Sequence, residues 1–194
     1  MTIDVRALTG AALDAALEDV ARLRIAVFRD WPYLYDGDLA YERRYLAAYH
    51  GPGAILVGAF DGARLVGAST GTPMADHAAE FAAAFAGVPV PLDRIFYGGE
   101  SVLPAEYRGR GIGHRFFDLR EDHARARGAT HFAFCAVIRP QDHPARPAGY
   151  RSNEVFWQKR GYAPLPGVIA RFRWKDIGEA EETEKPLQFW MRAL

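Results

Sequence analysis

Apolar residues recur at helical spacing in five segments, which predicts five helices. In the first segment, residues 8–30, apolar side chains return at Leu13 and Leu17 on one side of the helix. Thr9 stands just before this pattern and is the expected N-cap. The other four predicted helices cover residues 38–50, 75–87, 111–127 and 153–162.

Shorter apolar runs predict six strands. Two of these runs, residues 54–60 and 63–71, flank the turn residues Asp61-Gly62 and so predict a β-hairpin. The other predicted strands cover residues 94–103, 131–138, 167–174 and 187–194. Within the run 94–103, the pair Gly98-Gly99 indicates a bulge or kink, because glycine in a strand often marks an irregular ladder.

This order of elements predicts an α/β fold. The front of the sheet is expected to be antiparallel, and the strands 94–103 and 131–138 to be parallel because a helix connects them. A mixed, mostly antiparallel twisted sheet with a central parallel strand–helix–strand crossover and flanking helices satisfies these constraints. With 194 residues, of which 49% are hydrophobic, the chain is expected to form a single domain over residues 1–194.

Composition excludes several classes of partner. Lys plus Arg and Asp plus Glu both number 24, so the zero net charge argues against nucleic acid or an anionic membrane surface. The single cysteine, Cys135, forms no internal disulfide, which suits a reducing compartment. No run has the length and apolar character of a membrane span or signal peptide. We therefore expect a cytoplasmic protein. The six histidines lack metal-ligand spacing, so no metal is expected.

A glycine-rich loop, "YRGRGIGHRFF", precedes the helix 111–127. The start of a helix exposes backbone N–H groups and partial positive charge, and glycines let a phosphate approach that backbone closely. Neighbouring guanidinium groups add further charge. The loop is therefore suited to a pyrophosphate. The residues expected around this anion are Arg108, Gly109, Arg110, Gly111, Ile112, Gly113 and His114.

Two common phosphate motifs do not fit this loop. A Walker loop ends in Gly-Lys-Ser/Thr, whereas Gly113 is followed by His114. A dinucleotide fingerprint needs Gly at the sixth position, which is His114 counted from Gly109 and Phe116 counted from Gly111.

The loop resembles the acyl-CoA signature Q/R-x-x-G-x-G/A of the GNAT N-acetyltransferase superfamily, met here by Arg108, Gly111 and Gly113. The segment "FWQKRGY" is similar to the closing helix of that family, and the order of elements agrees over roughly residues 5–194. The resemblance implies the GNAT fold and acetyl-CoA as co-substrate, with the CoA pyrophosphate on the amides of residues 109–114. One departure is the extra residue between Pro104 and Arg108.

The resemblance also implies roles along the central strand. The pantetheine arm would lie between "ESVL" and "FCAV", paired with main-chain groups of Val102 and Leu103, one of which would stabilise the oxyanion. Glu100 is the expected general base. The alternative for Glu100 is a carboxylate held by an arginine, with no part in proton transfer.

The general acid is harder to assign. Trp157 stands where the family usually has a tyrosine, and an indole N–H is not a usable acid. Trp157 is expected to line the acyl pocket or to belong to the core. Asn153 is expected to bind the pantetheine or its phosphate, and Tyr150 is the substitute acid. Cys135 is a less favoured nucleophile, because buried free cysteines are usually small hydrophobic residues.

The implied reaction is direct transfer of an acetyl group to a primary amine of a small molecule, a protein lysine or an N-terminus. A different class remains open, a CoA-binding sensor with the same fold, and a nucleotide-phosphate binder is a third. The final hairpin is a common dimer surface in the family, so a homodimer is possible.

The acceptor is expected beside aromatic and acidic residues: Phe28, Asp30, Trp31, Tyr33, Tyr35, Asp36, Asp38, Tyr41, Phe96 and Tyr97.

Overall fold

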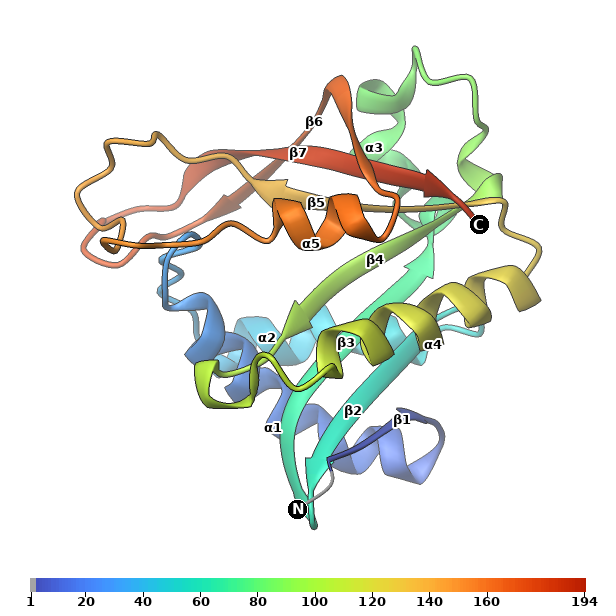
Figure 1. Ribbon diagram of the computed structural model, residues 1–194, viewed down its shortest axis with the longest axis horizontal. Helices are drawn as coiled ribbons and strands as arrows, with labels where there is room; N and C mark the ends of the chain where they lie inside the picture. Colours follow the sequence, from blue (N-terminus) through green and yellow to red (C-terminus); the bar gives the residue numbers. More distant parts are fainter. Residues whose placement is uncertain (1–2) are drawn as a thin grey trace.

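One mixed sheet organises the part of the chain that the computed structural model describes, residues 3–194 without the side chain of Ala48. Its strand order is β1-β2-β3-β4-β5-β7-β6 (Figure 1). The strands are β1 Asp4–Leu8, β2 Ile55–Asp61, β3 Arg64–Pro73, β4 Ile95–Val102, β5 His131–Val137, β6 Ala163–Trp174 and β7 Thr183–Ala193. Neighbouring strands are antiparallel except β4 and β5, so the predicted parallel crossover is confirmed.

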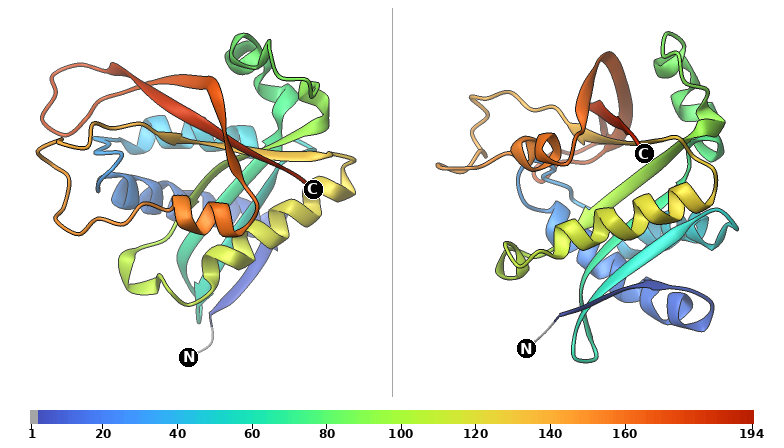
Figure 2. Two further views of the ribbon diagram at one scale, coloured as in Figure 1. Left: turned by 45° about the horizontal axis from the view of Figure 1, so that its top comes forward. Right: turned by 45° about the vertical axis from the view of Figure 1, so that its right-hand side comes forward.

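Helices cover both faces of this sheet (Figures 1 and 2). The five helices found in residues 3–194 are α1 Ala11–Phe28, α2 Leu39–Leu46, α3 Ala78–Phe85, α4 Ile112–Ala126 and α5 Glu154–Lys159. One core lies under α4 and α5, where Phe116, Phe132 and Trp190 are buried. The opposite face carries α1 and α2 over one half of the sheet and α3 over the other.

Several predicted boundaries differ from the structure. No strand was predicted at Asp4–Leu8, yet this segment pairs with β2 and forms an edge of the sheet. Thr9 is not the N-cap of α1, because Gly10 takes that position with a φ of 52° and no side chain caps the helix. The second helix is α-helical only to Leu46 and continues as a 3₁₀ turn, Ala47–His50.

The bulge predicted at Gly98-Gly99 is present, because the register between β3 and β4 shifts between Ser69 and Gly71. Both glycines are required by close packing. A Cβ on Gly98 would lie 2.7 Å from the ring of Phe132, and one on Gly99 would overlap the hydroxyl of Tyr49. The bulge also changes the alternation of side chains along β4.

A side chain at Gly99 tests this packing. We expect Gly99→Ala to lower the free energy of unfolding by about 1–3 kcal/mol, because the new methyl group must displace Tyr49 in a filled core. Urea denaturation measures the change. Gly87→Ala is the matched control, since a Cβ there meets no atom within 4 Å. Equal stabilities of the two variants would contradict the packing described here.

Candidate active site

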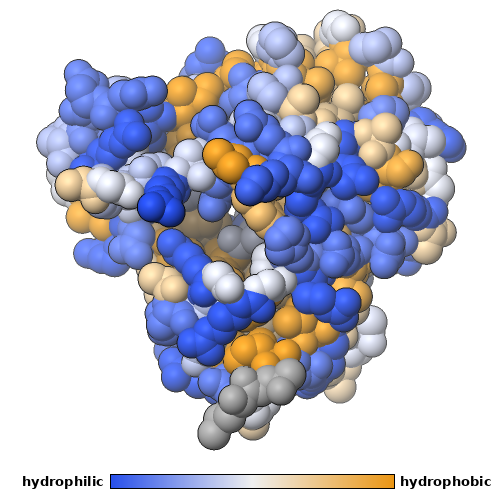
Figure 3. All heavy atoms as spheres, viewed as in Figure 1, coloured by the Kyte–Doolittle hydropathy of each residue, from blue (hydrophilic) through white to orange (hydrophobic). Residues whose placement is uncertain are grey.

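The sheet opens between β4 and β5. These strands pair through three residue couples only, the last of which is Tyr97 with Ala133. Beyond them β4 remains paired to β3, and β5 remains paired to β7 along its whole length. The strands therefore diverge, and the surface is hollowed between the halves that carry α4 and α5 (Figures 1 and 3). The facing edges of the two strands expose backbone groups that an extended ligand can pair with.

The glycine loop lies at the start of α4, on one face of this opening. Gly109 and Gly111 have φ values of 73° and 78°, in the left-handed region that glycine adopts without strain. Within residues 3–194, no backbone N–H from Gly109 to His114 donates a loop, cap or side-chain hydrogen bond. These donors gather where the helix dipole adds positive charge, as the sequence motif requires for an anion.

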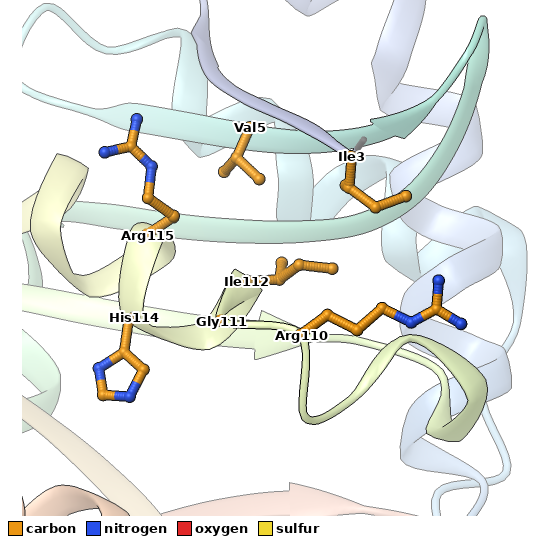
Figure 4. Close-up of a pocket in the computed structure, with 7 residues that line it drawn as sticks. All are labelled: Ile3, Val5, Arg110, Gly111, Ile112, His114 and Arg115. Atoms are coloured by element: carbon orange, nitrogen blue, oxygen red, sulfur yellow. The ribbon is translucent and has the colours of Figure 1, made fainter. Parts of the chain in front are cut away.

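The side chains of the loop divide between two directions (Figure 4). Arg110 and Arg115 border a depression of about 430 Å³ whose floor is apolar. The residues that line it are Ile3, Val5, Arg110, Gly111, Ile112, His114 and Arg115. The imidazole of His114 points away from Ile3 and Val5. It lies edge-on to Phe156 of α5, and its Nδ1 is 3.3 Å from a guanidinium nitrogen of Arg160.

Part of the basic charge is used to shape the loop itself. The Nε of Arg108 donates to the carbonyl of Leu103 at 3.0 Å, and Arg110 donates to the carbonyl of Glu106 at 2.9 Å. The carbonyl of Leu103 is therefore already bound to Arg108. Val102 is fully buried on the face of α1 and α2 and is paired with Ala68 of β3.

Glu100 points to the face of β4 that carries α1 and α2, opposite α4, and is only 8% exposed. Its Oε2 accepts a hydrogen bond from the hydroxyl of Tyr45 at 2.9 Å and is 2.7 Å from a guanidinium nitrogen of Arg24. Its Oε1 is buried and has no hydrogen-bond partner among the described residues. The arginine partner considered from the sequence is thus present, while one carboxylate oxygen keeps its full capacity to accept.

Arg24 joins two buried carboxylates. Its Nε binds Glu42, which is fully buried, and its guanidinium group stacks on the ring of Tyr45 at 4.1 Å. Burial acts to lower the pKa of Arg24, but Glu100 and Glu42 outweigh burial and hold the pKa well above its usual value. The cluster carries one cation against two carboxylates, so this side of the opening favours a positively charged guest.

The segment that follows α1 is fixed to the end of β5 and to the residues after β6. Arg139, just past β5, donates to the carbonyls of Pro32 and Tyr33 at 2.8 and 2.6 Å and forms a bidentate ion pair with Asp176. Burial raises the pKa of Tyr33, and Cys135 and Glu100 add to that rise. The ring of Tyr33 packs against the apolar cluster that includes Tyr97 and Cys135.

Of the predicted acceptor residues, Tyr33 and Tyr97 lie on the face opposite α4. Phe96 does not, because its ring is packed under α4, edge-on to His123. The strand alternates its side chains, so these neighbours on β4 face opposite sides of the sheet.

Tyr150 lies in the loop between β5 and α5, with its ring 6.0 Å from that of Trp31. Burial raises the pKa of Tyr150, while the guanidinium groups of Arg146 and Arg108 oppose the rise. The structure gives no contact between Tyr150 and Glu100.

The two α5 residues differ in their surroundings. Asn153 is exposed at the N-cap of α5, and its side chain makes no capping hydrogen bond. Trp157 is half-buried, with its ring 5.0 Å from Phe134 of β5 and 5.2 Å from Trp190 of β7. These contacts favour packing as the main role of Trp157.

Sequence reasoning did not assign Arg24, Arg120 or Arg139 to a site. Arg24 and Arg120 each stand one turn after an apolar residue, Val20 and Phe116, on the buried stripe of their helix. A charged residue at such a position is a signal that can be found in the sequence. Nothing local in the sequence indicates the partners of Arg139.

The sequence profile described as the acetyltransferase (GNAT) family matches residues 17–148. No protein with a curated description matches the chain in sequence.

In residues 3–194, no helix is long and apolar enough to cross a membrane, and no group of three or more His, Cys, Asp or Glu is placed to hold a metal ion.

Solved structures share the fold over nearly the whole chain at low sequence identity. A ribosomal-protein-alanine N-acetyltransferase from Brucella melitensis has a TM-score of 0.62 and 14% identity, with 98% of this chain and 99% of that chain covered. An aminoglycoside 6′-N-acetyltransferase complexed with coenzyme A has a TM-score of 0.60 and 17% identity, with 100% and 97% covered. The protein yncA from Salmonella typhimurium, solved with its cofactor acetyl-CoA, has a TM-score of 0.60 and 11% identity, with 100% and 95% covered.

Cys135 offers a direct chemical check on this site. Its thiol is buried 3.4 Å from the hydroxyl of Tyr97, and burial raises its pKa to about 12. We expect the folded protein at pH 8 to react with a disulfide reagent on the order of a thousandfold more slowly than the unfolded chain, because the thiolate is the reactive form. Absorbance of the released thiol measures the rate, with guanidinium-unfolded protein as reference. Stoichiometric labelling of the folded protein within minutes would place Cys135 in an open, reactive site instead.

Proposed function

The chain belongs to the GNAT family of acetyltransferases, and from that premise we propose that it transfers an acetyl group from acetyl-CoA to a primary amine of a small molecule or protein. The observation that carries the proposal is the opening between β4 and β5, with unpaired amides on one face and a buried, acidic cluster on the other. An acyl donor and an amine can thus approach one another from opposite faces of the sheet.

The residues of the glycine loop fit the CoA pyrophosphate. The amides of residues 109–114 supply donors, and the left-handed Gly109 and Gly111 leave the approach free of side chains. The proposal gives the anion-binding role to Arg108, Arg110 and His114, and contacts along the arm to Val102, Leu103, Asn153 and Trp157. CoA supplies a thioester, whose thiol is a tolerable leaving group because its pKa is about 8.5.

Proton transfer in this proposal falls to Glu100. An alkyl ammonium has a pKa near ~10.4 and must lose a proton before it attacks the thioester carbonyl. The unpartnered Oε1 of Glu100 is the acceptor for that proton, directly or through water. An amide of β4 near Val102 or Leu103 stabilises the oxyanion. Tyr150 protonates the departing thiolate, and its raised pKa means that it carries its proton at neutral pH.

The acceptor is proposed as a cationic amine. Arg24, Glu42 and Glu100 leave a net negative charge on that side, and the rings of Tyr33 and Tyr45 lie beside it. Proteins that share the fold are named for an aminoglycoside and for a ribosomal-protein alanine, so the proposal keeps both small and protein amines. We also propose that residues 1–194 form one acyltransferase domain and that the protein acts in the reducing cytoplasm. A homodimer through the final hairpin is part of the same proposal.

A second candidate function is a CoA-binding sensor without turnover. The ion pair between Glu100 and Arg24 favours it, because an arginine that holds the carboxylate gives Glu100 a structural role without proton transfer. The replacement of the usual tyrosine by Trp157, which is packed against Phe134 and Trp190, points the same way. The two functions differ in whether acetyl-CoA is consumed.

Thiol release from acetyl-CoA over a panel of polyamines, amino sugars, amino acids and peptides decides between them. We expect release with at least one cationic primary amine, and we expect Glu100→Gln to lower kcat by about 10²–10⁴-fold with unchanged CoA affinity. Glu184→Gln, which breaks an exposed ion pair with Arg171, is the control and should keep the wild-type rate. Tight acetyl-CoA binding with no release for any amine would identify the sensor. Wild-type turnover in Glu100→Gln would remove Glu100 as the base.

The phosphate site is tested separately at Gly113. This residue has an ordinary φ, and a Cβ there would lie 3.6 Å from Phe156, so a side chain fits without backbone strain. We expect Gly113→Glu to weaken CoA binding at least ~100-fold in titration calorimetry, because a carboxylate would stand among the anion-binding amides. Gly87→Glu adds the same charge at an exposed, open position and should bind CoA normally. Unchanged affinity of the Gly113 variant would place the pyrophosphate elsewhere.

A further inference from the structure

Arg120 of α4 is only 2% exposed, and all of its hydrogen bonds end on β3, β4 or its own helix. One terminal nitrogen donates to the carbonyls of Thr70 at 3.0 Å and Glu100 at 3.1 Å. The other donates to the hydroxyl of Ser101 at 3.0 Å, and Nε donates to the carbonyl of Phe116 at 3.2 Å.

No carboxylate in residues 3–194 forms an ion pair with this guanidinium group; its flat faces meet the rings of Phe117 and Phe132 at 4.8 and 5.4 Å. Burial lowers the pKa of Arg120 to about 10, so the group is still a cation at neutral pH. An arginine buried without an ion-pair partner is costly, and its hydrogen bonds compensate for the lost water. Such a group needs a role that an apolar side chain would not fill.

The bound carbonyls lie at the bulge. In the ladder between β3 and β4, Ser69 pairs with Ser101 and Gly71 pairs with Gly98, which leaves Thr70 opposite both Gly99 and Glu100. The regular ladder is interrupted there, and Arg120 spans the interruption by binding one carbonyl from each strand. The arginine thus supplies donors where the two strands no longer supply them to each other.

The bulge determines which way Glu100 faces. Before it, Phe96 and Gly98 face α4, while Tyr97 and Gly99 face the other side. Uninterrupted alternation would turn residue 100 toward α4. Instead its carboxylate meets Arg24 and Tyr45 on the face of α1 and α2. The extra residue of the bulge reverses the alternation.

We propose that Arg120 is a positioning residue, which holds this bulge from the face of α4 and thereby keeps the carboxylate of Glu100 on the face where the amine arrives. The inference deepens the proposed function and rests on it. Arg120 touches the main chain of Glu100 and not its carboxylate, so its effect on turnover passes through Glu100.

A double-mutant cycle measures that dependence. With the amine found in the panel, we expect Arg120→Met to lower kcat by about 10–100-fold while KM for acetyl-CoA stays within about twofold. In the Glu100→Gln background, we expect Arg120→Met to lower kcat by less than about threefold more. Arg120→Lys keeps the cation with a single donor group and should recover part of the rate. Should Arg120→Met fail to fold, Arg120→Lys and Ser101→Ala replace it in the cycle.

Arg192→Lys is the matched control, because Arg192 also donates to backbone carbonyls, those of Arg160 and Ala193, but away from the bulge. It should leave both kinetic constants unchanged. Equal losses of kcat in the wild-type and Glu100→Gln backgrounds would overturn the inference, since Arg120 would then act independently of Glu100. A lowered melting temperature with unchanged kcat would overturn it as well, since the role would be structural only.

An acceptor-independent measurement separates this inference from the proposed function. The side-chain carboxyl signal of Glu100 in a ¹³C-glutamate-labelled protein is identified by its loss in Glu100→Gln. We expect it to shift in Arg120→Lys and Ser101→Ala and to stay in place in Arg192→Lys. A wild-type protein that releases no thiol counts against the proposed function alone, whereas an unmoved carboxyl signal in the Arg120 and Ser101 variants counts against the positioning role.

Discussion

Incomplete pairing of two parallel strands is the constraint on which the candidate site depends. β5 stays bonded to β7 over seven residue pairs, and β4 stays bonded to β3 on both sides of its bulge. Each of the two strands β4 and β5 is therefore held by its outer neighbour and cannot shift to restore the pairing between them. A bulge increases local twist, and here it begins at Gly99, two residues after Tyr97, whose pair with Ala133 is the last between β4 and β5. The sheet thus opens without losing its outer ladders, and its unpaired backbone faces the gap.

The two faces of this opening differ in charge and accessibility. On the face of α4 the glycine loop offers exposed amides and arginines, a setting for a phosphate that remains in contact with water. On the other face Arg24, Glu42 and Glu100 are buried together, where a low effective dielectric strengthens each charge. An anionic group and a cationic group are therefore favoured on opposite sides, with the strand between them.

Buried and part-buried arginines connect these parts. Arg24 joins α1 to α2 and β4, Arg120 joins α4 to the bulge, and Arg139 joins the end of β5 to the segment after α1. The planar fork of a guanidinium group binds several oxygens at once, which a lysine cannot do. In each case the arginine joins elements that are distant in sequence, so the geometry of the site is held by side chains outside the reaction itself.

The sequence alone determined the local features of this protein. Hydrophobic periodicity indicated five helices, turn residues indicated the hairpin at Asp61-Gly62, and the glycine spacing indicated a tight turn into the helix α4, because each depends on neighbours along the chain. Gly98-Gly99 likewise indicated the bulge. Only the tertiary structure decided that Asp4–Leu8 is a strand, that Phe96 faces α4, and that Arg24 and Arg120 lie on either side of β4. Those outcomes depend on the register of strands and the packing of helices far apart in sequence, and no local pattern contains that information.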